Sequence, residues 1–174
     1  MNHRLLIVGA GTYAAVAAEI AASMGCFERI DFIDDGRKTT ANGKPVIGTT
    51  EDICRLSDES DSIVVAIGDP EIRLALLERL KTQSSFRIAT LISPRAYVSP
   101  SAQIAEGCVI EPMAVVHTSC RIARGCIISA GAVINHETTC LEGVHVDCNA
   151  TVAGYACVPA KKKVFCGEIF QQKA

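Results

Sequence analysis

The feature that most limits the fold of this chain is a six-residue repeat in its C-terminal half. Every sixth residue from Val98 to Val164 is Ile or Val, apart from Cys140. The fourth residue after each aliphatic is small in the first ten hexads, and glycine recurs one place earlier, at 107, 125, 131 and 143. This period fits neither an amphipathic helix nor ordinary hairpins. It predicts a parallel β-helix in which each hexad supplies one short strand and one corner, with the aliphatic side chain inside.

Residues 1–92 follow a different pattern, in which short apolar runs alternate with helix-forming segments. The runs at 5–11, 30–33, 62–68 and 87–92 predict strands, and the segments 12–24 and 71–81 predict helices. Strands that alternate with helices predict a small parallel sheet of the Rossmann-like, nucleotide-binding kind. The sequence thus predicts a small α/β domain over 1–92 and a β-helix over 93–174.

A glycine-rich segment points to a nucleotide ligand for the first domain. GAGTYA (residues 9–14) fits the G-x-G-x-x-G/A pattern, follows a predicted strand and opens a predicted helix. Asp34 and Asp35 lie at about the spacing expected for an acid that binds ribose, and phosphates would lie against the helix N-terminus. The domain is about half of a dinucleotide fold, which favours a mononucleotide over NAD. A glycine turn without a ligand is the alternative.

Three histidines lie within the repeat, at His117, His136 and His145. His136 precedes Glu137 at a predicted corner. An imidazole titrates near neutrality and can take a proton during acyl transfer, and a neighbouring carboxylate can orient the ring. Gly154 falls one coil later, where its N–H could donate to a developing oxyanion. A solvated His–Glu pair beside a corner glycine is one alternative, and a zinc site formed by the three histidines is another.

Charge and cysteine content exclude several classes of partner. Lys and Arg number 17 against 19 Asp and Glu, for a net charge of -2, so no basic excess drives binding to nucleic acid or membranes. No apolar run approaches the roughly 18 residues of a membrane span. Nine cysteines without a CxxC pair indicate reduced thiols. We expect a cytoplasmic protein with no membrane span and no nucleic-acid partner.

The whole pattern resembles the sugar acyltransferases of the sialic-acid O-acetyltransferase and bacillosamine N-acetyltransferase type. The likeness covers nearly the entire chain, through LLIVGAGTYAAVAAEI, FIDDG, AIGDPEIR, LISPRAYVSPSAQIAEGCVI and GAVINHETTCLEGVHVDCNATVAG. It implies a small nucleotide-binding domain followed by a left-handed parallel β-helix. It also implies a homotrimer with active sites between subunits.

The resemblance also implies roles for single residues. His136 is expected to be the general base with Glu137 as its partner, and His145 and Gly154 are expected to bind acetyl-CoA. The residues expected to hold the nucleotide-linked sugar are Gly11, Thr12, Tyr13, Asp34, Asp35, Gly68 and Asp69.

The expected function is transfer of an acetyl group from acetyl-CoA, as co-substrate and without a metal, to the amino group of a nucleotide-linked sugar in surface-glycan biosynthesis. Tyr13 stands where the amino-sugar enzymes typically carry histidine. O-acetylation of a free or CMP-linked sugar acid therefore stays open, as does a nucleotide-binding trimer without turnover.

Overall fold

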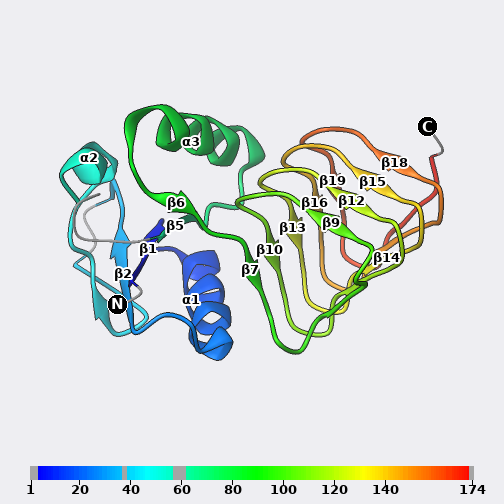
Figure 1. The fold of residues 1–174 in the computed structure, drawn as a ribbon, viewed down its shortest axis with the longest axis horizontal. Coiled ribbons are helices and arrows are strands. Elements are labelled where there is room, and N and C mark those ends of the chain that lie inside the picture. The colour runs from blue at the N-terminus through cyan, green and yellow to red at the C-terminus, as the bar shows by residue number, and fades with distance from the viewer. Residues whose placement is uncertain (1–3, 37–38, 57–61, 173–174) are drawn as a thin grey trace. The chain divides into compact units, whose positions relative to one another are not determined.

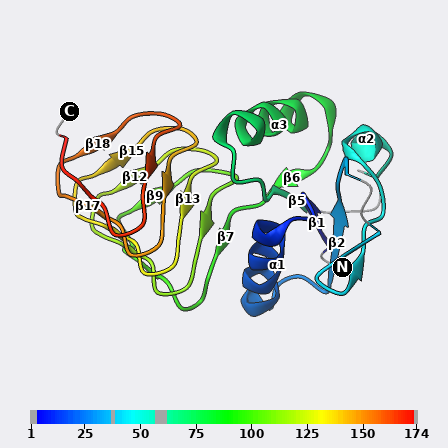
Figure 2. The ribbon, with the colours of Figure 1, turned by 180° about the vertical axis from the view of Figure 1, so that it is seen from behind.

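The structure, a computed structural model, describes residues 4–36, 39–56 and 62–172. The chain divides into two compact units, Met1–Ala89 and Thr90–Ala174. The first combines helices with a parallel sheet, and the second is a β-helix, as the sequence predicts (Figures 1 and 2).

The first unit is built on a four-stranded parallel sheet with the order β2-β1-β5-β6. Its strands are β1 (Arg4–Val8), β2 (Arg29–Ile33), β5 (Ser62–Val65) and β6 (Arg87–Ile88). Its helices are α1 (Thr12–Met24), the 3-10 turn η1 (Thr50–Asp52), α2 (Ile53–Leu56) and α3 (Pro70–Gln83). A small antiparallel pair is formed by β3 (Thr40–Ala41) and β4 (Lys44–Pro45).

Local sequence explains where these elements begin and end. The alanine-rich α1 stops at Gly25, which has a φ of 67°. Strand β1 ends before Gly9, whose φ is 110° and whose position would bring a Cβ to 3.0 Å from the carbonyl oxygen of Ala66. Only glycine combines that φ with so close a neighbour. Because β1, β2 and β5 are parallel neighbours, their carboxyl ends meet at one edge of the sheet.

The second unit consists of three parallel sheets of two-residue strands, named here after their first strands. The β7 sheet contains β7 (Leu91–Ile92), β10 (Val109–Ile110), β13 (Ile127–Ile128), β16 (His145–Val146) and β19 (Lys163–Val164). The β8 sheet contains β8 (Tyr97–Val98), β11 (Val115–Val116), β14 (Val133–Ile134), β17 (Thr151–Val152) and β20 (Ile169–Phe170). The β9 sheet contains β9 (Gln103–Ile104), β12 (Arg121–Ile122), β15 (Thr139–Cys140) and β18 (Cys157–Val158).

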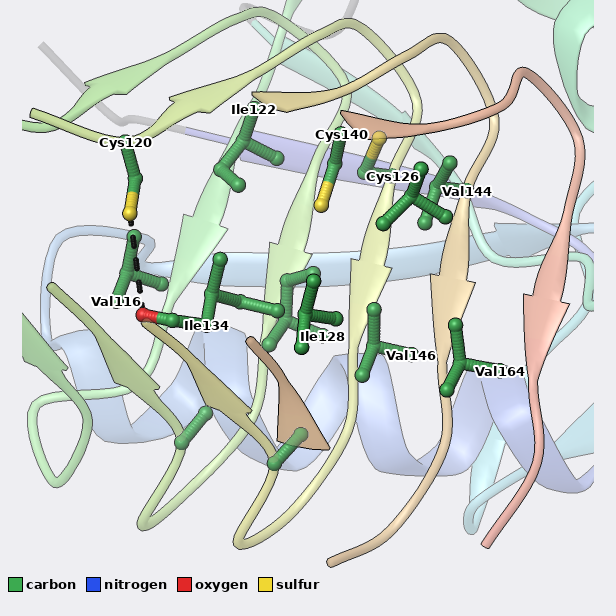
Figure 3. Packing of buried hydrophobic residues seen from close by; sticks show 14 of the residues in the cluster. Val116, Cys120, Ile122, Cys126, Ile128, Ile134, Cys140, Val144, Val146 and Val164 are labelled. Atoms are coloured by element: carbon green, nitrogen blue, oxygen red, sulfur yellow. Dashed lines mark hydrogen bonds between the residues drawn. The ribbon is translucent and has the colours of Figure 1, made fainter. Parts of the chain in front are cut away.

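The second residue of each strand points into the β-helix and forms its core (Figure 3). Each strand pairs with the strand three hexads later, as Ile134 does with Val152. Cys108, Cys120 and Cys126 occupy small positions of the repeat and are fully buried, which confirms their interpretation as packing residues. Cys140 replaces an aliphatic residue in the same core, and burial raises the pKa of its thiol.

The structure corrects the single strand predicted over residues 87–92. It contains two strands there, β6 and β7, which belong to different units. The N–H of Ala89 donates to Ile63 in the first sheet, whereas the N–H of Leu91 donates to Cys108 in the β-helix. Ile92 is one hexad before Val98, so the six-residue period starts earlier than the sequence reading placed it.

Candidate functional site

The predicted catalytic corner lies between β14 and β15, and the coils on both sides fix its backbone. The N–H of Asn135 donates to Val152 at 3.0 Å, and the N–H of Glu137 donates to Thr118 at 3.0 Å. The side-chain oxygen of Asn135 accepts the N–H of His136 at 2.9 Å. The exposed imidazole of His136 therefore projects from a backbone held on each side of it.

Gly154 lies against the ring of His136, one coil further along. A Cβ at position 154 would lie 2.9 Å from Cε1 and 3.1 Å from Nε2 of His136. The φ of Gly154 is not in the left-handed region, so the imidazole, and not backbone strain, requires glycine here. No described residue accepts the N–H of Gly154. The predicted stacking of these two positions is confirmed.

Tyr155 is a neighbour of His136 that the sequence reasoning missed. The two rings meet edge to face, with centroids 5.0 Å apart and planes at 84°. The backbone N–H of Tyr155 donates to the carbonyl oxygen of His136 at 3.1 Å, and its side chain is 61% exposed. The signal was present, because Tyr155 follows Gly154 and lies one coil after Glu137.

The role expected for Glu137, as the partner of His136, has no direct contact behind it. In the part of the chain that the structure describes, no hydrogen bond or ion pair joins its carboxylate to His136. Its φ of 58° lies in the left-handed region, and its side chain lines a polar groove together with Arg121. Orientation of the imidazole by Glu137 therefore stays a hypothesis.

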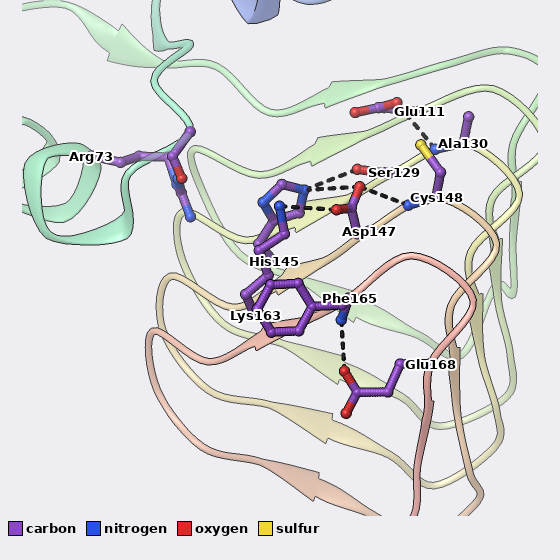
Figure 4. A network of polar contacts seen from close by, with 11 residues as sticks. Arg73, Glu111, Ser129, Ala130, His145, Asp147, Cys148, Lys163, Phe165 and Glu168 are labelled. Carbon is purple, nitrogen blue, oxygen red and sulfur yellow. Dashed lines mark hydrogen bonds and ion pairs between the residues drawn. The ribbon is translucent and has the colours of Figure 1, made fainter.

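His145 belongs to a separate polar network (Figure 4). Its Nε2 lies 3.1 Å from the hydroxyl of Ser129 and 4.0 Å from Oδ1 of Asp147. The other carboxylate oxygen of Asp147 lies 2.9 Å from Nζ of Lys163. This hydrogen bond from Lys163 holds the pKa of Asp147 below its ordinary value. Asp147 also accepts the N–H of Cys148 at 2.9 Å.

Within one chain, His136 and His145 are not brought together. His136 follows β14 of the β8 sheet, whereas His145 begins β16 of the β7 sheet. No hydrogen bond or ring contact joins them among the described residues. The two histidines thus belong to different sheets and to different sets of contacts.

The third histidine of the repeat, His117, has its own aromatic neighbour. Its ring lies 6.4 Å from that of Tyr97, centroid to centroid. Across residues 4–36, 39–56 and 62–172, no three His, Cys, Asp or Glu side chains are grouped closely enough to hold a metal ion. The three histidines are therefore not gathered into a zinc site by one chain.

The first unit contains a cleft of about 460 Å³ at the carboxyl edge of its sheet. The ends of β1, β2 and β5 contribute Gly9, Asp34, Asp35 and Ile67. Helix α3 closes the cleft with a mainly apolar face made of Ile72, Ala75, Leu76 and Arg79. The sequence reasoning missed this helix face, because no motif marks it. This lining, an apolar wall beside two carboxylates and one guanidinium, has the chemistry expected of a site for a nucleobase and its ribose.

The two aspartates of this cleft already hold its loops in place. Asp34 accepts the N–H of Ala10 at 2.6 Å, so it ties the glycine-rich loop to the end of β2. Asp35 accepts both the N–H and the hydroxyl of Thr50, at 2.7 and 2.9 Å. Arg79 donates to the carbonyl oxygen of Thr50 at 3.1 Å. Each carboxylate keeps lone pairs for further donors.

The other predicted nucleotide residues lie outside the lining of this cleft. Gly11 is the N-cap of α1, and Thr12 and Tyr13 form its first turn. Asp69 caps α3, because its carboxylate accepts the N–H groups of Glu71 and Ile72 at 2.9 and 3.0 Å. The carbonyl oxygen of Gly68 accepts a hydrogen bond from the side chain of Arg73. For Asp69 and Gly68, the structure thus shows stabilising contacts within the unit.

Comparisons with known proteins match both units. Residues 4–80 match the model of the PglD N-terminal domain, and residues 101–136 match that of the bacterial transferase hexapeptide (six repeats). A comparison with curated proteins finds no match. No helix in the described ranges has the length and apolar character to cross a membrane.

Solved structures resemble the chain over almost its whole length. The acetyltransferase domain of PglB from Neisseria gonorrhoeae is 33% identical, with a TM-score of 0.90 over 98% of this chain and 83% of that one. A structure of that domain with acetyl coenzyme A has a TM-score of 0.83 at 32% identity, over 99% of this chain and 83% of that one. A perosamine N-acetyltransferase mutant from Caulobacter crescentus, solved with CoA and GDP-perosamine, shares the fold at 22% identity and a TM-score of 0.87, over 99% of this chain and 90% of that one.

Proposed function

Because the chain belongs to the hexapeptide-repeat acetyltransferases of the PglB and PglD type, we propose that it acetylates the amino group of a nucleotide-linked sugar with acetyl-CoA. One observation carries the proposal: an exposed imidazole, His136, lies against Gly154, whose N–H has no acceptor among the described residues. A base and an oxyanion donor side by side are what acyl transfer to an amine requires.

The proposed reaction follows from these two groups. The acceptor nitrogen attacks the thioester carbonyl carbon, a C–N bond forms, and His136 takes the proton that the nitrogen loses. The N–H of Gly154 donates to the oxygen that becomes negative. When the C–S bond breaks, the imidazolium of His136 returns the proton to the sulfur, which leaves as the thiol of CoA. The products are the acetamido sugar and CoA.

The supporting residues take secondary roles in this proposal. We assign His145 to the acetyl-CoA side, because it lies on a strand after His136 and its ring is positioned by the hydroxyl of Ser129, 3.1 Å from Nε2. We assign Glu137 to stabilise the imidazolium of His136. This role requires the side chain of Glu137 to rotate toward His136. No step of this scheme needs a metal.

In this proposal the first unit binds the nucleotide of the acceptor. Its cleft would hold the nucleotide, with the base against α3 and the ribose near Asp34 and Asp35. The perosamine N-acetyltransferase structure solved with GDP-perosamine is consistent with this class of ligand. Gly11, Thr12 and Tyr13 would serve phosphates at the start of α1, while Gly68 and Asp69 would shape the edge of the site.

We further propose that the enzyme is a homotrimer with active sites between subunits. The separation of His136 and His145 within one chain supports this assembly. So do the exposed apolar side chains on the two end strands of the β8 sheet, Tyr97 on β8 and Ile169 on β20, which are 55% and 62% exposed. Light scattering should give three times the 18.5 kDa chain mass. None of the nine cysteines, all within the described ranges, forms a disulfide bond, which supports a cytoplasmic location.

The experiment is acetyl transfer from labelled acetyl-CoA to a panel of UDP- and GDP-linked amino sugars. A CMP-linked sugar acid and a free sugar acid serve as hydroxyl acceptors in the same panel. We expect label in an amide of one nucleotide-linked amino sugar. Label only in an ester would contradict N-acetylation, and no transfer to any acceptor would contradict the proposed function.

A further inference from the structure

Two cysteines outside the core of the β-helix occupy the same corner position in consecutive coils. Cys148 follows β16 and Cys166 follows β19, each two residues after the inward-pointing valine of its strand. Cys148 is half-buried and Cys166 is exposed. The function proposed above gives neither thiol a role.

The backbone places these two residues one above the other. Strands β16 and β19 pair in parallel register. The N–H of Asp147 donates to Val164 at 2.9 Å, and the N–H of Gly167 donates to Cys148 at 3.2 Å, so the register continues through the corner. Neighbouring strands lie about 4.8 Å apart, and Cα atoms joined by a disulfide usually lie about 4.4–6.8 Å apart. The backbone spacing therefore suits a disulfide between Cys148 and Cys166.

The side chains also leave the two corners in the same direction. The residue after each cysteine has a left-handed backbone, with a φ of 56° at Asn149 and 71° at Gly167. His136 occupies the equivalent position at another corner, two residues after an inward aliphatic and just before a left-handed residue. Its ring lies against the backbone one coil later, 2.9 Å from where a Cβ of residue 154 would stand. By the same geometry, the side chain of the first cysteine is directed toward the second.

The ionisation of Cys148 also reflects the thiol beside it. Burial raises its pKa, and the neighbouring Glu111, Asp147 and Cys166 raise it further. Cys148 is therefore a neutral thiol at neutral pH. Its partner is the more exposed of the two, so an oxidant in solution meets Cys166 first.

The core contains a second pair of cysteines one coil apart, Cys108 and Cys126, which serves as an internal comparison. A hydrogen bond with the thiol of Cys108, and then burial, raises the pKa of Cys126. Cysteines one coil apart thus bring their sulfur atoms into contact in this fold. Both core thiols are fully buried, which protects them from oxidants. No other two cysteines of the chain are one coil apart.

We infer that Cys148 and Cys166 form a reversible disulfide when the protein meets an oxidising disulfide such as oxidised glutathione. The thiolate of Cys166 attacks one sulfur of oxidised glutathione, whose S–S bond breaks, and one glutathione takes up a proton and leaves as a thiol. Cys148 then loses its proton and attacks the sulfur of Cys166, and the second glutathione leaves as a thiol. Two protein thiols are oxidised, and one glutathione disulfide is reduced.

This disulfide clamps the last coil of the β-helix. In the described part of the chain, β19 and β20 each pair with one strand only, because they end their sheets. A bond between the two corners closes a loop of one coil and restricts the unfolded chain. We expect oxidation to lower the equilibrium constant for unfolding about tenfold or more.

The test treats the folded full chain with oxidised glutathione, blocks free thiols by alkylation and maps disulfides by peptide mass spectrometry. The wild type should yield one linked pair of peptides, which contain Cys148 and Cys166. Cys108 and Cys126 should stay reduced. Cys148→Ser should stop at a mixed disulfide of glutathione with Cys166. Cys157→Ser is the matched control, since Cys157 is also half-buried but has no cysteine one coil away, and it should form the linkage as the wild type does.

Urea unfolding gives a second measurement. The oxidised wild type should unfold at a higher urea concentration than the reduced protein, and dithiothreitol or Cys166→Ser should abolish this difference. No linkage between Cys148 and Cys166 in the wild type would overturn the inference. So would a linkage that is equally abundant when the protein is oxidised in urea, or an oxidised protein that is no more stable than the reduced one.

Discussion

The imidazole of His136 is in contact with the backbone of Gly154, at a separation that leaves no room for a methyl group. A Cβ at position 154 would lie 2.9 Å from Cε1 of the ring. The six-residue period sets this relationship, because strands β14 and β17 pair in register and place the two corners one above the other. The proposed base and the proposed oxyanion donor are therefore fixed relative to each other by the repeat itself.

Gly154→Ala should lower the rate of acetyl transfer without unfolding the β-helix. The new methyl group must displace the exposed ring of His136, and a shift of about 1 Å in a reacting group costs on the order of 100-fold in rate. Steady-state kinetics would check this. Thr118→Ala, at the same corner position two coils before Gly154, should leave the rate unchanged. A fully active Gly154→Ala enzyme would show that the contact has no catalytic importance.

Removal of the ring of Tyr155 should leave the imidazole of His136 less firmly positioned. An edge-to-face contact contributes about 0.5–1.5 kcal/mol beyond burial, so Tyr155→Ala should lower kcat by about two- to tenfold. Tyr155→Phe keeps the ring and should retain activity. Equal losses in Tyr155→Phe and Tyr155→Ala would instead assign the effect to the hydroxyl.

Stability should depend on pH through Asp147. The hydrogen bond from Lys163 lowers the pKa of Asp147 below its ordinary value of 3.8. A carboxyl group with a lowered pKa in the folded state stabilises the protein above its ordinary pKa, and this contribution is lost as the pH falls through the folded-state pKa. The side chains of Asp147 and Lys163 are 25% and 42% exposed, so we expect only about 0.5 kcal/mol.

Lys163→Met tests this assignment by urea unfolding. The wild type should be more stable than the variant at about pH 7, and the difference should shrink in acid, as the pH falls below 3.8 and through the lowered folded-state pKa of Asp147. A stability difference that is the same at both pH values would mean that packing, for example against Phe165, causes it.

Two substitutions separate nucleotide binding from stability in the first unit. Ala75→Phe places a ring in the cleft and should weaken nucleotide binding about tenfold or more, with little change in the free energy of unfolding. Asp69→Ala removes the cap of α3 and should cost about 1 kcal/mol of stability. Calorimetric titration with UDP and GDP, together with urea unfolding, would check both. If Asp69→Ala weakened nucleotide binding more than Ala75→Phe does, the nucleotide would not bind in the cleft.

The repeat made the β-helix and the His136–Gly154 contact predictable, because a fixed period determines which corners lie above one another. The details of the first unit were harder to predict from the sequence than those of the β-helix. The resemblance implied a nucleotide-binding role for Asp69, whereas the structure shows its carboxylate as the cap of a helix. The cleft wall on α3 depends on which face of the helix meets the sheet edge, and the weak amphipathic pattern of this helix does not reveal that face.

Side-chain directions at the corners were also hidden in the sequence. Glu137 was expected beside His136 because the two are adjacent in the chain. In the structure Glu137 has a left-handed backbone and lines the groove that contains Arg121. Residue spacing alone does not encode this conformation, because the position tolerates Ser119, Glu137 and Tyr155 in successive coils.

The most direct measurement of the central claim is acetyl transfer to the best nucleotide-linked amino sugar by His136→Ala and His117→Ala, beside the wild type. Both histidines are exposed at the same edge of the β-helix, and each has an aromatic neighbour. If His136 is the general base, its loss should lower kcat/KM by about 100- to 10,000-fold, while His117→Ala should match the wild type. Similar activities of the two variants would contradict the account.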